Sequence, residues 1–338
     1  EQVRDFIHVS DIAQANLSAM ESKTKFGFFN IGTGESTSIK NLANIIIKLS
    51  DEKLGLKFNL VILPYHFYVP VSNILELNKD KSWQKKTNLK GINFNKLNQI
   101  SNIKKIMLPY LSEYKNGKIY QDATKNNYGL GFGAIEAQAL HGVIRHIKPN
   151  KIIEIGSGVS TYCMLKAGAK NITCIEPYPS KFLIKNKKIH LIKKNIQKIN
   201  LDIFKSLSKN DLLFIDSSHT LKINSDLTKI YLEILPILKK GVIIQIHDIF
   251  FPYNFQRDAN NSIYQWMETQ LLQAFLINNN KIEIIFSMSY LHYEAPNELK
   301  KLFPIYKPQK DINGIAKSMF KTPENEGYFP SSIYLKVI

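Results

Sequence analysis

The C-terminal two thirds of the chain alternates short apolar strands with helical segments, and this alternation is the strongest constraint on its fold. The strands carry few polar residues, so both of their faces must be covered. A helical segment lies between most consecutive strands, and a parallel neighbour needs a crossover of that kind. We therefore predict an α/β protein with a largely parallel, Rossmann-like sheet and helices on both faces. The predicted strands are residues 152–155, 172–175, 189–192, 212–215, 242–246, 282–286 and 333–337.

The strength of this pattern divides the 338 residues into three parts. Residues 1–55 form a short N-terminal part with helical stretches of its own. Residues 56–110 show weak periodicity, with Pro64 and Pro70 followed by a lysine-rich stretch, so we predict a linker that leads into the next part. Residues 111–338 carry the predicted sheet. No helix is predicted between the last two strands, which favours an antiparallel pair at one edge of the sheet.

A glycine-rich turn joins the first predicted strand to the helix that follows it. Gly156 and Gly158 let the backbone turn tightly and approach a ligand, and backbone N–H groups from Ser157 onward would face that ligand. Glu176 ends the next strand, about 20 positions after the first glycine, where a carboxylate can accept both ribose hydroxyls of an adenosine. The spacing therefore predicts a nucleoside-binding turn.

This turn suits S-adenosylmethionine better than NAD. NAD sites usually carry a third glycine that lets the helix pack close to the strand under a pyrophosphate, and Thr161 stands at that position. S-adenosylmethionine has no pyrophosphate, and its sulfonium and amino-acid end carry positive charge that Glu154 can balance. We therefore predict S-adenosylmethionine as the cofactor, with Glu154 in its site.

Polar side chains follow the fourth and fifth predicted strands. Asp216 and His219 come after the fourth strand, and His247 and Asp248 come after the fifth. The carboxyl ends of parallel strands meet at one edge, where open α/β sheets bind ligands. These residues can supply a general base, or hold Mg²⁺ on Asp216 and Asp248, or bond only to loop backbone. The aromatic residues at 250–255 can wall an acceptor pocket or pack in the core.

Together these motifs resemble the class I S-adenosylmethionine-dependent methyltransferase family with IDSSH and HDIF signatures. The resemblance rests on IIEIGSGVSTYCML, CIEPYP, DLLFIDSSHT and ILPILKKGVIIQIHDIFFPY, and it covers about residues 65–338. It implies a seven-stranded sheet whose last strand is antiparallel. It also implies cofactor binding by Glu154, Gly156, Gly158 and Glu176. Asn195, after the third strand, stands where the family often has an Asp near the adenine amine.

The N-terminal part resembles a different family. RDFIHVSDIA near the start, and NIGTGESTS before a helix, are similar to the C-terminal part of extended short-chain NAD-dependent sugar-nucleotide epimerases and dehydratases. The resemblance covers only about 50 residues and lacks that family's cofactor-binding half. Arg4 matches the arginine that meets the nucleotide diphosphate. Gly32 and Gly34 predict a turn before a helix, because the third glycine of a dinucleotide site is missing.

Composition excludes several classes of protein. The net charge is +17, but only three of the 45 basic residues are arginine, and the lysines are spread along the chain. This favours a solvated basic surface over a nucleic-acid groove, since nucleic-acid readers rely on arginine. No secretory signal or membrane-spanning apolar run is found, so we expect a cytoplasmic protein without membrane partners. Cys163 and Cys174 are expected to be buried free thiols.

The sequence therefore predicts an S-adenosylmethionine-dependent methyltransferase that acts on an oxygen of a small-molecule or sugar-type acceptor. The epimerase-like N-terminal part is the indication of sugar-nucleotide chemistry. Two other functions stay open at this point. One is a remnant of an NAD-dependent sugar-nucleotide epimerase, and the other is a non-catalytic basic module that binds nucleic acid.

Overall fold

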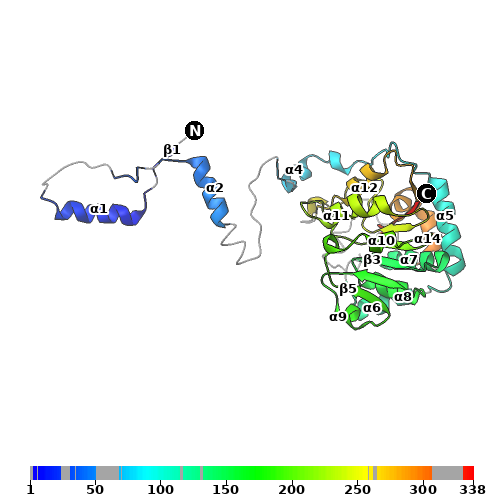
Figure 1. The fold of residues 1–338 in the computed structure, drawn as a ribbon. Coiled ribbons are helices and arrows are strands. Elements are labelled where there is room, and N and C mark those ends of the chain that lie inside the picture. Colours follow the sequence, from blue (N-terminus) through cyan, green and yellow to red (C-terminus); the bar gives the residue numbers. More distant parts are fainter. Residues whose placement is uncertain are drawn as a thin grey trace. The chain divides into compact units, whose positions relative to one another are not determined.

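The structure, a computed structural model, divides the chain into two units (Figure 1). We call residues 1–72 the head unit and residues 73–338 the body unit. The division falls within residues 56–110, the segment that we expected to link the two parts; the prediction for residues 56–67 lies outside the described residues. The structure describes residues 3–5, 7–23, 31–34, 36–50, 68–69, 71–114, 117–129, 132–257, 259–261, 265–306 and 330–338.

The described residues of the head unit form two helices and one short strand pair. β1 (Val3–Arg4) pairs antiparallel with β2 (Thr37–Ser38). α1 (Val9–Glu21) lies between the two strands in sequence, and α2 (Ile39–Ser50) follows β2 directly. None of the side chains described in this unit is buried. The described part of the head unit therefore has no core of its own.

The body unit is built on one seven-stranded sheet. Its order is β5-β4-β3-β6-β7-β9-β8, in which β3 to β7 run parallel and β9 runs antiparallel to both of its neighbours. This confirms the predicted Rossmann-like sheet with an antiparallel last strand. The strands are β3 (Ile152–Ile155), β4 (Ile172–Ile175), β5 (Ile189–Ile192), β6 (Leu212–Ile215), β7 (Ile243–Ile246), β8 (Ile282–Ser287) and β9 (Ile333–Val337).

Two helices between β8 and β9 show that one expectation was wrong. We expected no helix there, but α13 (Met288–Glu294) and α14 (Pro296–Leu302) follow β8. Both are only seven residues long, too short for a clear helical period in the sequence. Their apolar residues, such as Leu291 and Leu299, are buried in one cluster with residues of other helices. Tertiary packing therefore stabilises helices that the local pattern does not reveal.

Helices cover both faces of the sheet. Ile153 and Leu213 belong to one apolar cluster, while their neighbours Ile152 and Leu212 belong to another, because successive strand residues point to opposite faces. The described α-helices of the body unit not yet named are α4 (Ile74–Lys79), α5 (Lys96–Met107), α6 (Lys118–Lys125), α7 (Ala134–Ile147), α8 (Val159–Lys166), α9 (Lys181–Lys185), α10 (Asp202–Lys205), α11 (Asp226–Lys229) and α12 (Glu268–Leu276), and a π-helical turn, η6 (Ile230–Ile234), continues α11.

The strand register brings four loops to one edge of the sheet. Ile155, the last residue of β3, pairs with Ile175 of β4 and with Ile215 of β6. Ile215 in turn pairs with Ile246 at the end of β7. The residues directly after these strands therefore start at the same level, and both predicted groups of site residues lie among them.

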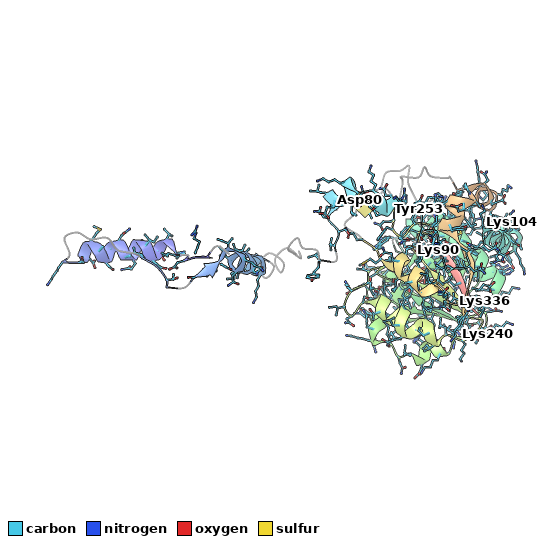
Figure 2. All side chains as sticks on the ribbon, turned by 90° about the horizontal axis from the view of Figure 1, so that it is seen from above. Asp80, Lys90, Lys104, Lys240, Tyr253 and Lys336 are labelled. Carbon is cyan, nitrogen blue, oxygen red and sulfur yellow. The ribbon has the colours of Figure 1, made fainter. Side chains whose placement is uncertain are left out.

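The surface of the body unit carries scattered lysines. Figure 2 labels four of them, Lys90, Lys104, Lys240 and Lys336, which come from different segments of the body unit. This arrangement agrees with the spread-out charge that we predict. Cys163 and Cys174 are buried free thiols, as expected. Within the described part of the chain, no helix combines the length and apolar character that a membrane crossing requires.

Candidate functional site

The turn after β3 needs glycine at its first position. Gly156 has a φ of +76°, and a Cβ atom placed there would lie 1.9 Å from the carbonyl oxygen of Asp216. Its N–H donates a hydrogen bond of 3.1 Å to the carbonyl of Ile175. Gly158 is also close to other backbone, since its Cβ would lie 3.1 Å from the carbonyl oxygen of Tyr128. The turn is therefore packed against backbone on both sides.

Glu154 is fully buried beneath this turn. Ser160 Oγ and Thr161 Oγ1 each donate to one of its carboxylate oxygens over 2.6 Å, and Cys174 Sγ donates over 3.3 Å. Burial raises the pKa of Glu154 to about 7, although these hydrogen bonds act in the opposite direction. Thr161 Oγ1 also accepts from the Gly158 N–H at 3.1 Å. The observed contacts of Glu154 thus hold the turn against the first residues of α8.

Glu176 lies beside the same turn at the end of β4. Its carboxylate accepts hydrogen bonds from the N–H of Ser157 at 3.2 Å and from the N–H of Tyr178 at 2.8 Å. It is only partly buried, so it can still receive donors from a ligand. Asn195 is exposed at the corresponding end of β5 and makes no side-chain cap bond there. The residues predicted to bind the cofactor therefore lie at or just after the ends of three neighbouring strands, β3, β4 and β5.

Asp216, His219, His247 and Asp248 form a compact group after β6 and β7, which we call the acid–imidazole cluster. One ligand atom from each of them lies within 4.8 Å of all the others. His219 Nε2 lies 3.3 Å from Asp216 Oδ1 and 3.5 Å from Asp248 Oδ2. His247 Nδ1 lies 3.5 Å and 3.4 Å from oxygens of the same two carboxylates. Each imidazole thus lies between both carboxylates.

These groups change one another's proton affinity. Burial alone would lower the pKa of both imidazoles, but the carboxylates outweigh it and raise the pKa of His219 to about 10 and that of His247 well above its usual value. Burial would raise the pKa of Asp216 and Asp248, yet the imidazoles hold both pKa values below the usual range. The imidazoles and the carboxylates thus each favour the charged form of the other.

Asp216 is the most exposed member of the cluster. The Asp216 side chain keeps 24% of its surface exposed, while the other three members keep 10% or less. The ring of Phe132 lies against His247, with centroids 5.2 Å apart, and that of Trp266 lies against His219 at 4.9 Å. Of the four side chains, that of Asp216 is therefore the most accessible from solvent.

The aromatic run after Asp248 lies mostly in the interior. Phe250, Phe251 and Tyr253 are all buried. Phe251 packs edge-on against Phe94, with ring centroids 5.2 Å apart. Of the two interpretations of this run that the sequence left open, core packing describes Phe251, which belongs to an apolar cluster of the sheet.

Three residues at the cluster have no signal in the sequence. Glu268 is fully buried and accepts a hydrogen bond of 2.7 Å from His219 Nδ1. Ser331 Oγ donates to Asp248 Oδ1 at 2.9 Å, and its N–H donates to the buried carboxylate of Glu136. These partners are separated from the motif residues by tens of positions along the chain. No local spacing links them, and only the packing of α12, β9 and α7 brings them to the cluster.

Comparison with known proteins finds matches to part of the body unit. Residues 153–249 match the family model described as a methyltransferase domain. An uncharacterized protein of Archaeoglobus fulgidus is 29% identical over 195 residues, which cover 52% of this chain and 86% of that protein. The solved structure of an O-methyltransferase from Bacillus cereus in complex with SAH is 13% identical, covers 54% of this chain and 90% of that one, and has a TM-score of 0.34.

A second relative concerns a much shorter stretch. A protein of Methanocaldococcus jannaschii with the provisional name UDP-glucose 4-epimerase is 49% identical over 45 residues. This match covers 13% of the present chain and 14% of that protein. Residues 153–249 of the body unit, which run from β3 to just after β7, are thus similar to a methyltransferase domain.

Proposed function

We propose that this domain transfers the methyl group of S-adenosylmethionine to a hydroxyl oxygen of a small molecule of sugar type. One observation carries the proposal: the glycine turn and the acid–imidazole cluster are in direct backbone contact. No side-chain atom fits between Gly156 and the carbonyl oxygen of Asp216. A donor held on the turn and an acceptor held at the cluster would therefore meet, as methyl transfer requires.

The donor side of the proposed site consists of the turn and the ends of β4 and β5. We assign Glu176 to the ribose hydroxyls and the turn from Gly156 through Ser157 to Gly158 to the amino-acid end of the donor. Asn195 would accept from the adenine amine. Glu154 belongs to this side as well, and its contacts with Ser160 and Thr161 support a role in holding the turn in shape.

The acceptor side is the acid–imidazole cluster. In the proposed reaction the acceptor oxygen bonds to the methyl carbon as the carbon–sulfur bond breaks, which leaves S-adenosylhomocysteine. The hydroxyl proton passes to a basic group of the cluster. The exposed edge of Asp216 supports this assignment, since it is the side from which a hydroxyl can approach. His219, His247 and Asp248 would fix the acceptor and balance charge around it.

The same four residues suit a divalent ion. Two close carboxylates need positive charge between them, and either imidazolium protons or a metal ion supply it. His247 Nδ1 is buried and forms no well-directed hydrogen bond, so it can serve as a ligand when an ion displaces its proton. Mg²⁺ would prefer the oxygens of Asp216 and Asp248, whereas Mn²⁺ or Zn²⁺ would accept the imidazoles too. We extend the proposal to such an ion, which would favour loss of the acceptor proton.

Asp248→Asn tests the acceptor side. Turnover should fall by about 10²–10⁴-fold, the usual contribution of acid–base groups, while donor affinity stays within about twofold. Asp202→Asn is the matched control, because Asp202 is exposed at the start of α10. Transfer of labelled methyl groups into a metabolite extract, followed by mass spectrometry, gives both the rate and the acceptor. Unchanged turnover in Asp248→Asn and His247→Ala would remove the cluster from the reaction.

Chelation separates the two forms of the proposal. If an ion is present, activity should be lost with a chelator and return with Mn²⁺ or Mg²⁺. Full activity in the chelator contradicts the ion and leaves an imidazole or carboxylate as the base.

The proposal has two further parts. The acceptor is of sugar type, and the head unit is a C-terminal fragment of a sugar-nucleotide epimerase or dehydratase. The resemblance of the first 50 or so residues to sugar-nucleotide epimerases supports them, as does the 45-residue match to the provisional epimerase. A labelled product without a sugar ring would overturn the sugar assignment and leave the methyl transfer itself intact.

A further inference from the structure

Glu268 is a buried carboxylate that none of the sequence motifs contains. It is the first residue of α12, and its exposed fraction is 0%. Three side chains bond to it: Ser217 Oγ at 3.0 Å, His219 Nδ1 at 2.7 Å and Tyr231 OH at 3.1 Å. A carboxylate without water is costly unless such donors satisfy it. Two of the three donors, Ser217 and His219, lie in the loop after β6. Glu268 and this loop therefore fix each other's position.

The residues around Glu268 hold His219 from three directions. The indole ring of Trp266 lies against the imidazole, with centroids 4.9 Å apart. The N–H of Met267 donates to the carbonyl oxygen of His219 at 2.9 Å. Glu268 then fixes the ring itself through Nδ1. Three consecutive residues thus contact the face, the backbone and one nitrogen of the same histidine.

These contacts stabilise an uncommon backbone conformation of His219. His219 has a φ of +57°, in the left-handed region that residues other than glycine rarely adopt. A conformation of this kind persists where surrounding contacts determine it. Met267 bonds to the carbonyl oxygen of His219, and Glu268 bonds to its Nδ1. They keep the other ring nitrogen, Nε2, directed at Asp216 and Asp248.

We propose that Glu268 is a positioning residue, which fixes His219 with Nδ1 protonated and Nε2 facing the acid–imidazole cluster. This inference rests on the proposed methyl transfer for its catalytic consequence. Carboxylates that accept from one nitrogen of a histidine commonly orient the other nitrogen for a metal or a substrate. Without Glu268 the ring can turn about its χ angles, and Nε2 no longer meets Asp216 and Asp248 together.

Two variants test the proposal, and in each the new side chain is close in size to the one it replaces. Glu268→Gln keeps the shape but leaves one oxygen for three donors, and we expect kcat to fall by about 10–100-fold. Tyr231→Phe removes another bond to the same carboxylate but leaves His219 bound to it, and we expect kcat to change by less than about threefold. Donor affinity, measured by calorimetry, should stay within about twofold in both. Equal losses of kcat in the two variants would show a merely structural role.

Nitrogen-15 NMR of the imidazoles tests the inference without any acceptor. In the wild-type protein, His219 should show a proton on Nδ1 in a strong hydrogen bond, assigned by its absence in His219→Gln. Tyr231→Phe should keep that signal, and Glu268→Gln should shift or lose it. A signal unaffected by Glu268→Gln overturns the proposal. If the signal behaves as expected but no methyl acceptor is found, the proposed function fails and the orientation of His219 stands.

Discussion

The head and body units contain helices of similar length with very different surroundings. α1 has 13 residues and none of them is buried, while Val9 and Met20 keep 74% and 82% of their surfaces exposed. α7 has 14 residues, and every residue from Ala134 to Ile144 is buried. The two helices differ in what packs against them. An apolar stripe is enough to specify a helix, but its burial depends on the other elements that the chain supplies.

The strands show the same contrast. β1 and β2 are two residues long and form an isolated pair among the described residues, and such pairs are marginally stable in water. The seven strands of the body unit support one another and two faces of packed side chains. We therefore expect stability and chemistry to reside in the body unit, and the following predictions test that separation.

The largest expected effect comes from a pair of glycine substitutions, one in each unit. Gly156 and Gly34 have nearly the same φ, +76° and +78°, but a Cβ at Gly34 meets nothing within 4 Å. Gly156→Ala should lower the free energy of unfolding by about 3 kcal/mol or more, because steric displacement adds to backbone strain. Gly34→Ala should cost only about 1 kcal/mol of local strain. Thermal denaturation and calorimetry with S-adenosylmethionine measure both.

A second control lies inside the body unit. Gly168 also has a positive φ, +95°, and open space around its would-be Cβ. Gly168→Ala should therefore resemble Gly34→Ala and leave donor binding unchanged. If Gly34→Ala weakened donor binding as much as Gly156→Ala, the two units would not be independent.

Glu176→Ala should have the next largest effect. It should weaken binding of S-adenosylmethionine by about 1.5–3 kcal/mol, the usual range for hydrogen bonds to a charged group. Glu233→Ala is the matched control, because Glu233 lies on the exposed side of its helical turn. Calorimetry gives the dissociation constants. An unchanged affinity would take Glu176 out of the donor site.

Removal of residues 1–72 should have the smallest effect. The remaining chain begins at Asn73, whose side chain accepts from the N–H of Leu75 and so caps α4. We expect donor affinity within about twofold and a change in unfolding free energy below about 1 kcal/mol, since no described side chain of the head unit is buried. An insoluble product, or one unable to bind the donor, would show that the head unit supports the methyltransferase domain.

Much of the body fold was predictable because its signals are local. The apolar runs at β3, β4 and β6 predicted the strand bounds residue for residue. Short helices such as α13 were missed, because seven residues do not establish a period. The local pattern also did not predict that β9 lies between β7 and β8. The position of the last strand depends on which part of the sheet it can reach.

The site shows the same division between local and long-range information. Asp216 and Asp248 could be placed together from the sequence, because parallel strands end at one edge and both residues follow such strands. The hydrogen-bond partners of the cluster could not be predicted in this way. Glu268 reaches His219 across 49 positions, and Ser331 reaches Asp248 across 83.

The sequence by itself thus determined the strands, the glycine turn and the carboxyl-end position of the charged residues, because each depends on neighbours within a few positions. Only the tertiary structure decided that Glu154 turns inward to Ser160 and Thr161, and that His219 is held by Glu268. The physical reason is that a buried polar group takes its partners from whatever packs beside it. Those partners come from other elements, and the periodicity of a single segment carries no information about them.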